Sequence, residues 1–547
     1  MEEPQTREAF KRRRQRRETM RVLLEVGALT TLAVLALTVL GFVLTAGKGR
    51  SAPPPGTLVV SQPSDFQTID PALATEREAW ELEYSTCAKL MNYPPKVRPE
   101  GTRLEPEVAA AQPHVSDDGR TYTFRIADGW KFSNGEAVTP RAFVRAFERA
   151  RTPNLVSPAE PYLREVSSWR ADGDELTVHL KERAPDFLQR LALPYFCAVP
   201  PETPATPVDA IPSAGPFFVK RHAHNRSLVL ERNPYYSGPR RPHIDKIIYR
   251  FGAFASQIGL QLSRGEADYG VVPPSVFESL ASRGQTKNMF TVPQPIVGYL
   301  ALNTQRPLFA DNAPLRRAVN YALDRPALAG ATDDAPSDDL LPPGIPGSRG
   351  GRAIYPLEGP DLSTARALAG PAQRSAVLLV GTPDSCGECA SLASTIRGDL
   401  ERIGIDVKVR PLDDPLGEAT RPGSHWDLLL ANWFADYPDP STFVNVLLDS
   451  GRPLAGVDWG GPTSFVRYND QRYLKQIRGA YLVQGSARGL TYRRVATDMF
   501  RNSPPMAVFA TIRGSPQFFS SRIGCHVFRP QDGGLVDLAA LCLRGKS

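Results

Sequence analysis

The sequence lacks the short motifs on which many hydrolases depend, and it has few of the residues that most often perform catalysis. It contains neither a Gly-x-Ser-x-Gly nucleophile elbow nor a His-Glu-x-x-His helix, and only 7 of its 547 residues are histidine. Without a nucleophile and a base at a recognisable spacing, no hydrolytic chemistry is indicated. We therefore expect a protein that is not an enzyme and that uses no cofactor.

Histidines are scattered along the chain, with one pair as the exception. His222 and His224 alternate as on one face of a strand, which is a spacing that suits two metal ligands. The same spacing is common for two surface side chains. We adopt the surface interpretation, so the sequence predicts no metal site.

Excess positive charge is concentrated at one end of the chain. The sequence has 65 Lys and Arg against 58 Asp and Glu, which gives a formal net charge of +7. Residues 1–21 hold eight Lys or Arg and four Glu, so this short arm carries four of the seven charges. The remainder is close to balance and needs no large basic face. Nucleic acid is therefore not an expected partner.

An uncharged apolar run follows the basic arm, from Val26 to Gly47. Its 22 residues would form roughly 33 Å of helix, enough to cross a hydrocarbon core of about 30 Å. The Lys and Arg before it predict a cytoplasmic arm (1–21), a single-pass transmembrane anchor (22–47), a Pro/Gly linker (48–57) and an exported domain. A cleaved secretory signal is the alternative, although the run is long and no clean A-x-A site follows it.

The sequence contains only six cysteines, an even number, and the first of them is Cys87. None ends the apolar run to carry a lipid, and outside the cytoplasm pairing is expected. The C-x-x-C spacing at residues 386–389 would also suit redox chemistry or half a zinc site, but no second C-x-x-C accompanies it. Six cysteines allow fifteen connectivities. The pairs that we favour are Cys386–Cys389, Cys525–Cys542 and, by elimination, Cys87–Cys197.

Strand and helix patterns are mixed through the rest of the chain, which indicates the α/β class. The segment 376–431 has the order β-α-β-β, as in a lobe with a mainly parallel core. Strands are predicted at residues 57–61, 120–126, 228–231, 246–251, 376–380, 407–409 and 426–431, and helices at 140–151, 314–323 and 389–403.

A series of short motifs resembles the extracytoplasmic solute-binding proteins of oligopeptide, dipeptide and nickel ABC importers (family 5), and the oligopeptide-binding members in particular. The block at residues 115–124 (VSDDGRTYTF) and 129–135 (GWKFSNG) is the most specific. The other segments, in the family's order, are 68–72 (TIDPA), 104–109 (LEPEVA), 213–217 (SAGPF), 231–236 (ERNPYY), 265–269 (GEADY), 302–304 (LNT), 316–325 (RRAVNYALDR) and 433–440 (WFADYPDP). The resemblance runs from about residue 58 to the end.

The resemblance implies a large two-lobed, periplasmic-binding-protein-like fold of type II that closes on its ligand about a hinge. The first lobe would comprise residues 58–292 and 513–547, and the second 293–512. It also implies a function: a monomer captures peptides and delivers them to the permease subunits and ATPases of an ABC importer. Two departures stand out, namely the helical anchor and the loop-like segment 331–352.

The resemblance also implies the binding residues. Asp436 matches the family's aspartate for the peptide α-amine, Trp433 matches an aromatic residue of a side-chain pocket, and Tyr437 is its neighbour in the same motif. A buried amine requires a carboxylate, because an unpaired buried charge is costly. The remaining candidates lie where the two lobes of family members approach peptide: Asn303 and Thr304 in the second lobe, Thr75 and Glu76 in the first.

Two other functions remain open. The chain could be an orphan two-lobed receptor or sensor that does not import, a role that a helical anchor suits equally well. It could also bind a different solute, such as a nickel chelate, haem or a sugar, since family members do so. The acidic Asp436 favours an amine over these ligands.

Overall fold

The computed structural model describes residues 53–272, 274–284, 287–292, 294–383, 386–421, 423–449, 466–514, 516–530 and 534–545. The chain divides into two units, Met1–Pro53 and Pro54–Ser547. The described helices and strands all belong to the second unit. The expected arm and anchor at residues 1–47 lie outside the described residues. From residue 53 onward, no described helix combines the length and apolar character that crossing a bilayer requires.

A seven-stranded sheet, in the order β12-β19-β11-β1-β10-β9-β8, forms the base of what we call the first lobe. β1 is parallel to both neighbours, and β10, β9 and β8 form an antiparallel meander. β19 comes from the C-terminal part of the chain and inserts between β11 and β12. The bounds are β1 Thr57–Ser61, β8 Phe217–Ala223, β9 Ser227–Arg232, β10 Lys246–Arg250, β11 Tyr269–Val271, β12 Met289–Thr291 and β19 Pro516–Phe519.

The first lobe also contains a four-stranded antiparallel sheet, β4-β5-β7-β6. Alternating burial along β5 puts Tyr122 and Phe124 into the same apolar core as helix α3, in agreement with the period-2 pattern. Its strands and the short pairs of this lobe are β4 His114–Val115, β5 Thr121–Arg125, β6 Val166–Asp172, β7 Glu175–Leu180, β2 Met91–Asn92 with β3 Glu105–Pro106, β20 Ile523–Cys525 with β23 Cys542–Leu543, and β21 Phe528–Arg529 with β22 Leu535–Val536.

The second lobe is built on a six-stranded sheet in the order β14-β18-β13-β17-β15-β16. β15 is parallel to β16 and β17, whereas β13 is antiparallel to β17 and β18, so the sheet is mixed. The bounds are β13 Ile296–Leu302, β14 Ala335–Pro336, β15 Arg374–Gly381, β16 Ile405–Leu412, β17 Leu428–Phe434 and β18 Met506–Thr511. The predicted order β-α-β-β missed one element, because helix α11 lies between β16 and β17.

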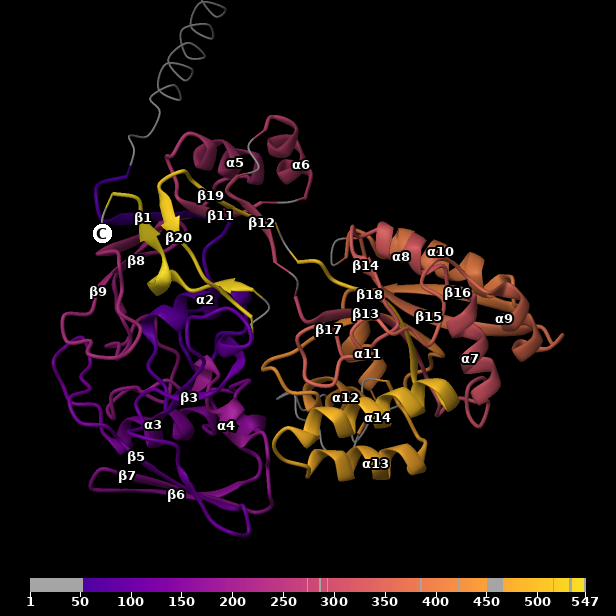
Figure 1. The fold of residues 1–547 in the computed structure, drawn as a ribbon, viewed down its shortest axis with the longest axis horizontal. Helices are drawn as coiled ribbons and strands as arrows, with labels where there is room; N and C mark the ends of the chain where they lie inside the picture. Colours follow the sequence, from indigo (N-terminus) through magenta and orange to yellow (C-terminus); the bar gives the residue numbers. More distant parts are fainter. Residues whose placement is uncertain are drawn as a thin grey trace, which may run out of the picture. The chain divides into compact units, whose positions relative to one another are not determined.

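Helices cover both faces of the six-stranded sheet (Figure 1). Along β13, Val297, Tyr299 and Ala301 pack with α12, α13 and α14, whereas Leu300 and Leu302 pack with α7, α8 and α10. This two-sided burial explains why β13 is a nearly continuous apolar run with no alternation. The predicted helix at 314–323 is confirmed as α7, and that at 389–403 as α10.

The helices vary from single turns to four turns. The α-helices are α2 Arg77–Thr86, α3 Pro140–Ala150, α4 Phe187–Arg190, α5 Ala255–Ser263, α6 Pro274–Ser282, α7 Ala313–Ala322, α8 Arg325–Gly330, α9 Leu362–Ala369, α10 Cys389–Glu401, α11 Pro415–Thr420, α12 Ser441–Leu448, α13 Gln471–Tyr481 and α14 Ala487–Asn502. The 3-10 turns are η1 Glu100–Thr102, η2 Glu160–Leu163, η3 Pro194–Phe196 and η4 Leu538–Ala540.

The chain passes between the two large sheets twice. It leaves the seven-stranded sheet after Thr291 and enters the six-stranded sheet at Ile296, then returns between Thr511 and Pro516. Two short, adjacent connections of this kind suit a hinge, because few backbone dihedrals then absorb a rotation of one lobe against the other.

Three disulfides hold the lobes internally, and they are the three pairs that the sequence suggested. The pair formed by Cys87 and Cys197 spans 110 residues and joins the C-terminal ends of α2 and η3. The other two bonds, Cys386–Cys389 and Cys525–Cys542, are local.

Candidate functional site

Asp436 lies in the loop between β17 and α12, where the second lobe meets the first. Its side chain is half-buried, and its Oδ2 accepts a hydrogen bond of 2.9 Å from the hydroxyl of Tyr162. Tyr162 belongs to η2 of the first lobe and is buried. Residues 274 positions apart thus meet through one carboxylate.

The charge of Asp436 has no cationic partner in the described part of the chain. Burial raises the pKa of its carboxyl to about 6, and the hydrogen bond from Tyr162 opposes this rise only in part. The pKa of Tyr162 is raised well above its usual value by burial and by the charge of Asp436, so the phenol stays protonated and donates. A carboxylate in this setting is stabilised by any cation that a ligand brings to it.

A row of aromatic side chains connects Asp436 with the segment before α2. The ring of Tyr162 lies 5.8 Å from that of Tyr195, which meets Trp80 edge-on at 5.6 Å between centroids. The indole N–H of Trp80 donates to the carbonyl of Ala74 at 2.8 Å. Thr75 and Glu76 are predicted ligand-binding residues. The backbone next to them is therefore held by the same row of aromatic side chains that reaches Asp436.

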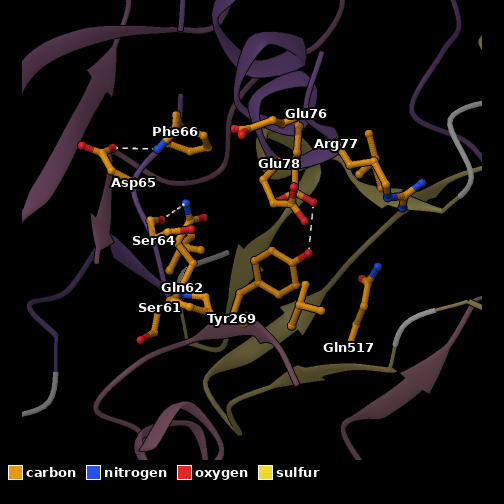
Figure 2. Close-up of a pocket in the computed structure, with 16 residues that line it drawn as sticks. Ser61, Gln62, Ser64, Asp65, Phe66, Glu76, Arg77, Glu78, Tyr269 and Gln517 are labelled. Atoms are coloured by element: carbon orange, nitrogen blue, oxygen red, sulfur yellow. Dashed lines mark hydrogen bonds between the residues drawn. The ribbon is translucent and has the colours of Figure 1, made fainter. Parts of the chain in front are cut away.

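Thr75 is exposed and Glu76 is half-buried. Glu76 is the N-cap residue of α2, and its side chain accepts the backbone N–H of Gln67 at 3.2 Å without capping the helix. Glu76 also lines a cavity of about 470 Å³ in the first lobe (Figure 2). The cavity is lined by Val60, Ser61, Gln62, Pro63, Ser64, Asp65, Phe66, Glu76, Arg77, Glu78, Glu81, Tyr269, Gly270, Val271, Gln517 and Leu535.

Acidic groups outnumber basic ones around this cavity, with four carboxyl side chains and one arginine. The deepest carboxyl belongs to Glu81, whose Oε2 accepts hydrogen bonds from the Tyr269 hydroxyl at 3.0 Å and from the Val536 amide at 3.1 Å. Burial raises the pKa of Glu81 to about 8, so at neutral pH it is mostly protonated. The remaining charges leave the cavity with a net negative character that suits a cationic group.

A second polar cluster joins the lobes beside Asp436, centred on the fully buried Asp186 at the start of α4. Its two carboxylate oxygens accept hydrogen bonds of 2.8 Å from the hydroxyls of Tyr437 and Tyr481, both in the second lobe. Burial alone would raise the pKa of Asp186, but Arg190, 2.9 Å away, and Arg488 reverse the effect and lower it. Asp186 is therefore a fully paired anion that binds the two lobes to each other.

Tyr437 takes part in this cluster, which differs from the ligand-binding role proposed for it. Its ring is 2% exposed, and its hydroxyl is used by Asp186. A side chain so enclosed presents little surface to a ligand. The structure places Tyr437 in the contact between lobes.

Trp433 lies at the end of β17 and is half-exposed. Its indole N–H donates to the carbonyl of Thr442 at 2.7 Å, and its ring stacks on Phe434 with centroids 6.2 Å apart and planes 24° apart. The hydrogen bond fixes the orientation of the ring, while Phe434 is 50% exposed beside it. This pair of rings is the main aromatic surface next to Asp436 in the second lobe.

The structure does not bring Asn303 and Thr304 together with Asp436. β13 and β17 are antiparallel, with Ile296 opposite Phe434 and Leu302 opposite Leu428. Asn303 therefore follows one end of the sheet and Asp436 follows the other. At about 3.4 Å per residue, this strand length separates them by roughly 20 Å.

Both residues have internal hydrogen-bond partners. The amide of Asn303 donates to the carbonyl of Trp426 at 2.8 Å and is fully buried. The hydroxyl of Thr304 donates to the carbonyl of Arg467 at 3.1 Å and accepts the backbone N–H of Asn469 at 2.8 Å. These hydrogen bonds close the end of β13, and Thr304 also lines a cavity of about 600 Å³ in the second lobe.

Five residues of the lobe contacts and the adjoining aromatic row were not found from the sequence: Tyr162, Tyr195, Asp186, Arg190 and Tyr481. None belongs to a motif that sequence reasoning used. The spacing of Asp186 and Arg190, four residues apart, could have indicated an ion pair on one helical turn. Nothing local points to the tyrosines, whose partners are distant in the sequence.

Comparison with known proteins identifies a family and individual proteins that this chain resembles. Residues 103–453 match the family model described as bacterial extracellular solute-binding proteins, family 5 Middle. The probable D,D-dipeptide-binding periplasmic protein DdpA of Escherichia coli K12 is 26% identical over 417 residues, covering 74% of this chain and 79% of the relative. The glutathione-binding protein GsiB of the same strain is 26% identical over 297 residues, covering 53% of this chain and 56% of the relative.

Solved structures show the same fold. A clavulanic acid biosynthesis oligopeptide binding protein 2 superposes with a TM-score of 0.75 at 24% identity, over 89% of this chain and 95% of that one. The periplasmic murein tripeptide binding protein MppA, in its unliganded open form, gives a TM-score of 0.71 at 21% identity, over 91% and 99%. The two-lobed α/β architecture expected from the sequence is confirmed.

Proposed function

Because the chain belongs to family 5 of the bacterial extracellular solute-binding proteins, we propose that it is the substrate-binding component of an ABC importer. In this function it captures peptides between its two lobes and delivers them to the permease subunits, which the associated ATPases drive. The related and structurally similar proteins include ones named for binding a dipeptide and a murein tripeptide, which supports a peptide as the ligand class.

The environment of Asp436 is the observation that carries the proposal. A peptide brings a cationic α-ammonium group, and Asp436 is a partly buried carboxylate that burial disfavours and that no described cation neutralises. Pairing with the ammonium would offset that cost, because opposite charges in a partly desolvated site attract strongly. The half-exposed Trp433 and Phe434 would then border the first side chains of the peptide.

Closure of the lobes would complete the site. The hydroxyl of Tyr162 reaches Asp436 from the first lobe, and Asp186 receives Tyr437 and Tyr481 from the second. We propose that these contacts form when the hinge closes and break when it opens. A ligand that bridges the lobes would then shift the equilibrium toward the closed form.

We further propose that the protein is attached to the membrane through residues 22–47, with residues 1–21 in the cytoplasm and the binding domain outside, as a monomer. The lobes would then comprise 58–292 with 513–547, and 293–512. Retention in the membrane fraction after alkaline carbonate extraction is the expected result. A chain that begins near residue 50 in the soluble fraction would contradict the anchor and indicate a cleaved signal.

Mass spectrometry of co-purifying ligands tests the main proposal. The full chain would be purified in mild detergent and denatured gently, and the released small molecules would be sequenced. We expect a set of short peptides with free N-termini. A single non-peptide compound would overturn the ligand class, while a peptide ligand with no permease in cross-linked membranes would favour a receptor over an importer.

A further inference from the structure

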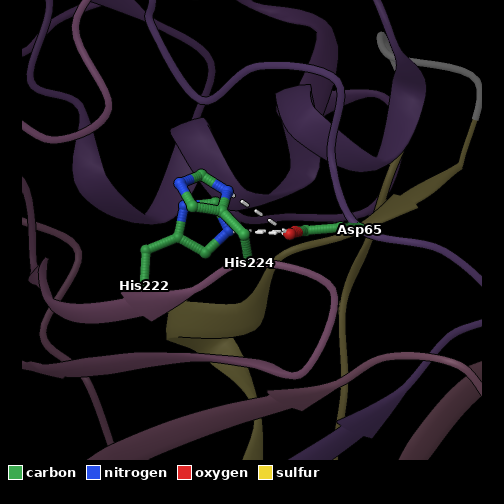
Figure 3. Close-up of side chains that lie close together, drawn as sticks. All are labelled: Asp65, His222 and His224. Atoms are coloured by element: carbon green, nitrogen blue, oxygen red, sulfur yellow. Dashed lines mark hydrogen bonds and ion pairs between the residues drawn. The ribbon is translucent and has the colours of Figure 1, made fainter.

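Two histidines and two aspartates from three separate segments converge on the surface of the first lobe. His222 is the penultimate residue of β8, and His224 begins the turn to β9. Asp65 lies in the loop after β1, and Asp209 lies in the chain before β8. The three residues Asp65, His222 and His224 each offer one ligand atom, and these atoms all lie within 4.8 Å of one another (Figure 3).

Distances in the cluster fit a small tetrahedral ion. The Nε2 atom of His222 lies 3.0 Å from both carboxylate oxygens of Asp65, and the Nδ1 atom of His224 lies 3.7 Å from Asp65 Oδ2. In a tetrahedral zinc site with bonds of about 2.0–2.1 Å, neighbouring ligand atoms are about 3.3 Å apart. The two separations from Asp65 bracket that value, and the third lies within 4.8 Å, so side-chain rotations would bring the three ligands onto one ion.

Asp209 supplies a second and independent feature of a metal site. Its carboxylate lies on the far side of both rings, 2.7 Å from Nδ1 of His222 and 3.6 Å from Nε2 of His224. Histidines that bind metal through one nitrogen usually donate the N–H of the other to a carboxylate, which fixes the tautomer and the ring orientation. His222 has that arrangement with Asp209, and Nε2 of His224 lies 3.6 Å from the other oxygen of the same carboxylate, slightly beyond hydrogen-bond length.

Burial argues against an ordinary surface ion pair. The side chain of His222 is only 3% exposed and that of Asp65 only 7%, whereas His224 is 65% exposed. The backbone N–H groups of Phe66 and Asn225 also donate to Asp65, at 2.9 and 2.8 Å, so its carboxylate is held in place. His224 is exposed to solvent, so an ion can reach the site. Asp65 and His222 are buried and held in place, so two of the ligands are already positioned.

We propose that Asp65, His222 and His224 bind a zinc ion, with Asp209 orienting the two imidazoles and a water molecule completing the coordination. Two imidazole nitrogens and a carboxylate oxygen form a ligand set that favours Zn²⁺, because Ca²⁺ and Mg²⁺ prefer oxygen ligands. The assignment replaces the surface-pair interpretation of His222 and His224.

The ion would tie the loop after β1 to the β8–β9 hairpin. Asp65 and the adjacent Phe66 line the cavity of the first lobe, and Phe66 packs on Tyr249 and Phe251 with ring centroids 5.3 and 5.7 Å apart. Zinc would thus stabilise one wall of that cavity. The site is separate from Asp436, so zinc binding does not depend on the proposed peptide function.

Zinc titration of the tag-free full chain, after treatment with a chelator, tests the proposal. Isothermal calorimetry should show one Zn²⁺ per chain, and the melting temperature should rise with zinc concentration, since a ligand that binds only the folded state stabilises it. Co²⁺ in place of zinc should give the intense visible absorption of a four-coordinate site.

His224→Gln is the informative variant because this side chain is exposed and its loss should leave the fold intact. We expect it to weaken zinc binding at least tenfold and to abolish the four-coordinate Co²⁺ spectrum. His243→Gln, an exposed histidine elsewhere in the first lobe, is the matched control and should bind zinc like the unmodified chain. No zinc binding by the unmodified chain, or equal binding by His224→Gln, would overturn the assignment.

Discussion

Replacing Asp436 by asparagine should weaken peptide binding strongly while leaving the fold intact. Asparagine has nearly the same shape and can still accept the hydrogen bond from Tyr162, so the contact between the lobes is retained. Only the negative charge is removed. The substitution therefore isolates the electrostatic part of the interaction with the peptide α-ammonium.

The size of the effect follows from the environment of the carboxylate. The pKa of Asp436 is raised from 3.8 to about 6, which corresponds to roughly 3 kcal/mol of disfavoured ionisation. At pH 7 the carboxyl is still mostly ionised, so the ammonium group meets a poorly solvated negative charge that gains from pairing. Removal of one partner of such a pair typically costs about 2–5 kcal/mol, and since Asp436 is only half-buried we expect the lower end, a rise in Kd of about 30- to 150-fold.

Calorimetry with two forms of one peptide gives a thermodynamic cycle. A peptide identified among the co-purifying ligands would be measured as the free amine and as its N-acetyl derivative, against the unmodified chain and Asp436→Asn. Acetylation should cost the unmodified chain about as much as the substitution does. In the variant, acetylation should then have little further effect.

Two results would refute this reasoning. If Asp436→Asn binds the free-amine peptide as tightly as the unmodified chain, the ammonium is bound elsewhere. If the variant loses equal affinity for both peptides, Asp436 acts on closure rather than on the amine. Asp117→Asn, at an exposed aspartate, is the control for a general loss of charge and should leave Kd unchanged.

Peptide binding should weaken about tenfold between pH 7 and pH 5, because the Asp436 carboxyl, with a pKa of about 6 in the free protein, is largely protonated at pH 5 and cannot pair with the ammonium. Calorimetry across this range should show the trend, and a Kd that does not change with pH would contradict it. Asn303→Ala should destabilise the protein by about 1–3 kcal/mol, since it leaves the buried Trp426 carbonyl without its donor, yet leave Kd for peptide unchanged; weaker binding by the folded variant would return Asn303 to the site. Replacing Cys87 and Cys197 together by alanine should cost up to about 4.7 kcal/mol in denaturant unfolding, because their bond closes a loop of 110 residues; an unchanged unfolding midpoint would show that this bond constrains little.

Many elements of the fold were predictable because their signals are local. The strand at 57–61 and the helix starting at Pro140 have the predicted bounds within one residue, since an apolar run between turn residues and a proline in the first helical turn are recognisable over a few positions. Many other elements were not identified, among them strands β13 and β18 and helices α11, α13 and α14. The two strands are buried on both faces, and such apolar runs have no period that separates strand from helix.

The candidate site was predictable only in part. Asp436 was found through a motif, and its half-buried position at the lobe contact supports the choice. Asn303 and Thr304 were grouped with it through the resemblance, but the antiparallel register of β13 and β17 puts them at opposite ends of the sheet. Strand register depends on side chains more than a hundred positions apart, and no local pattern encodes it.

The sequence alone determined the protein's family and part of its secondary structure, because motifs and periodicity are properties of short segments. It also suggested the three disulfide pairs that the structure contains. Tertiary structure decided the full environment of each buried carboxylate. Asp186, Asp436 and Asp65 look alike in sequence as loop aspartates, yet Asp186 is neutralised by Arg190, Asp436 accepts a hydrogen bond from the Tyr162 hydroxyl, and Asp65 faces two histidines. The reason is that the free energy of a carboxylate depends on the atoms within a few ångströms of it, and folding brings those atoms from distant parts of the chain.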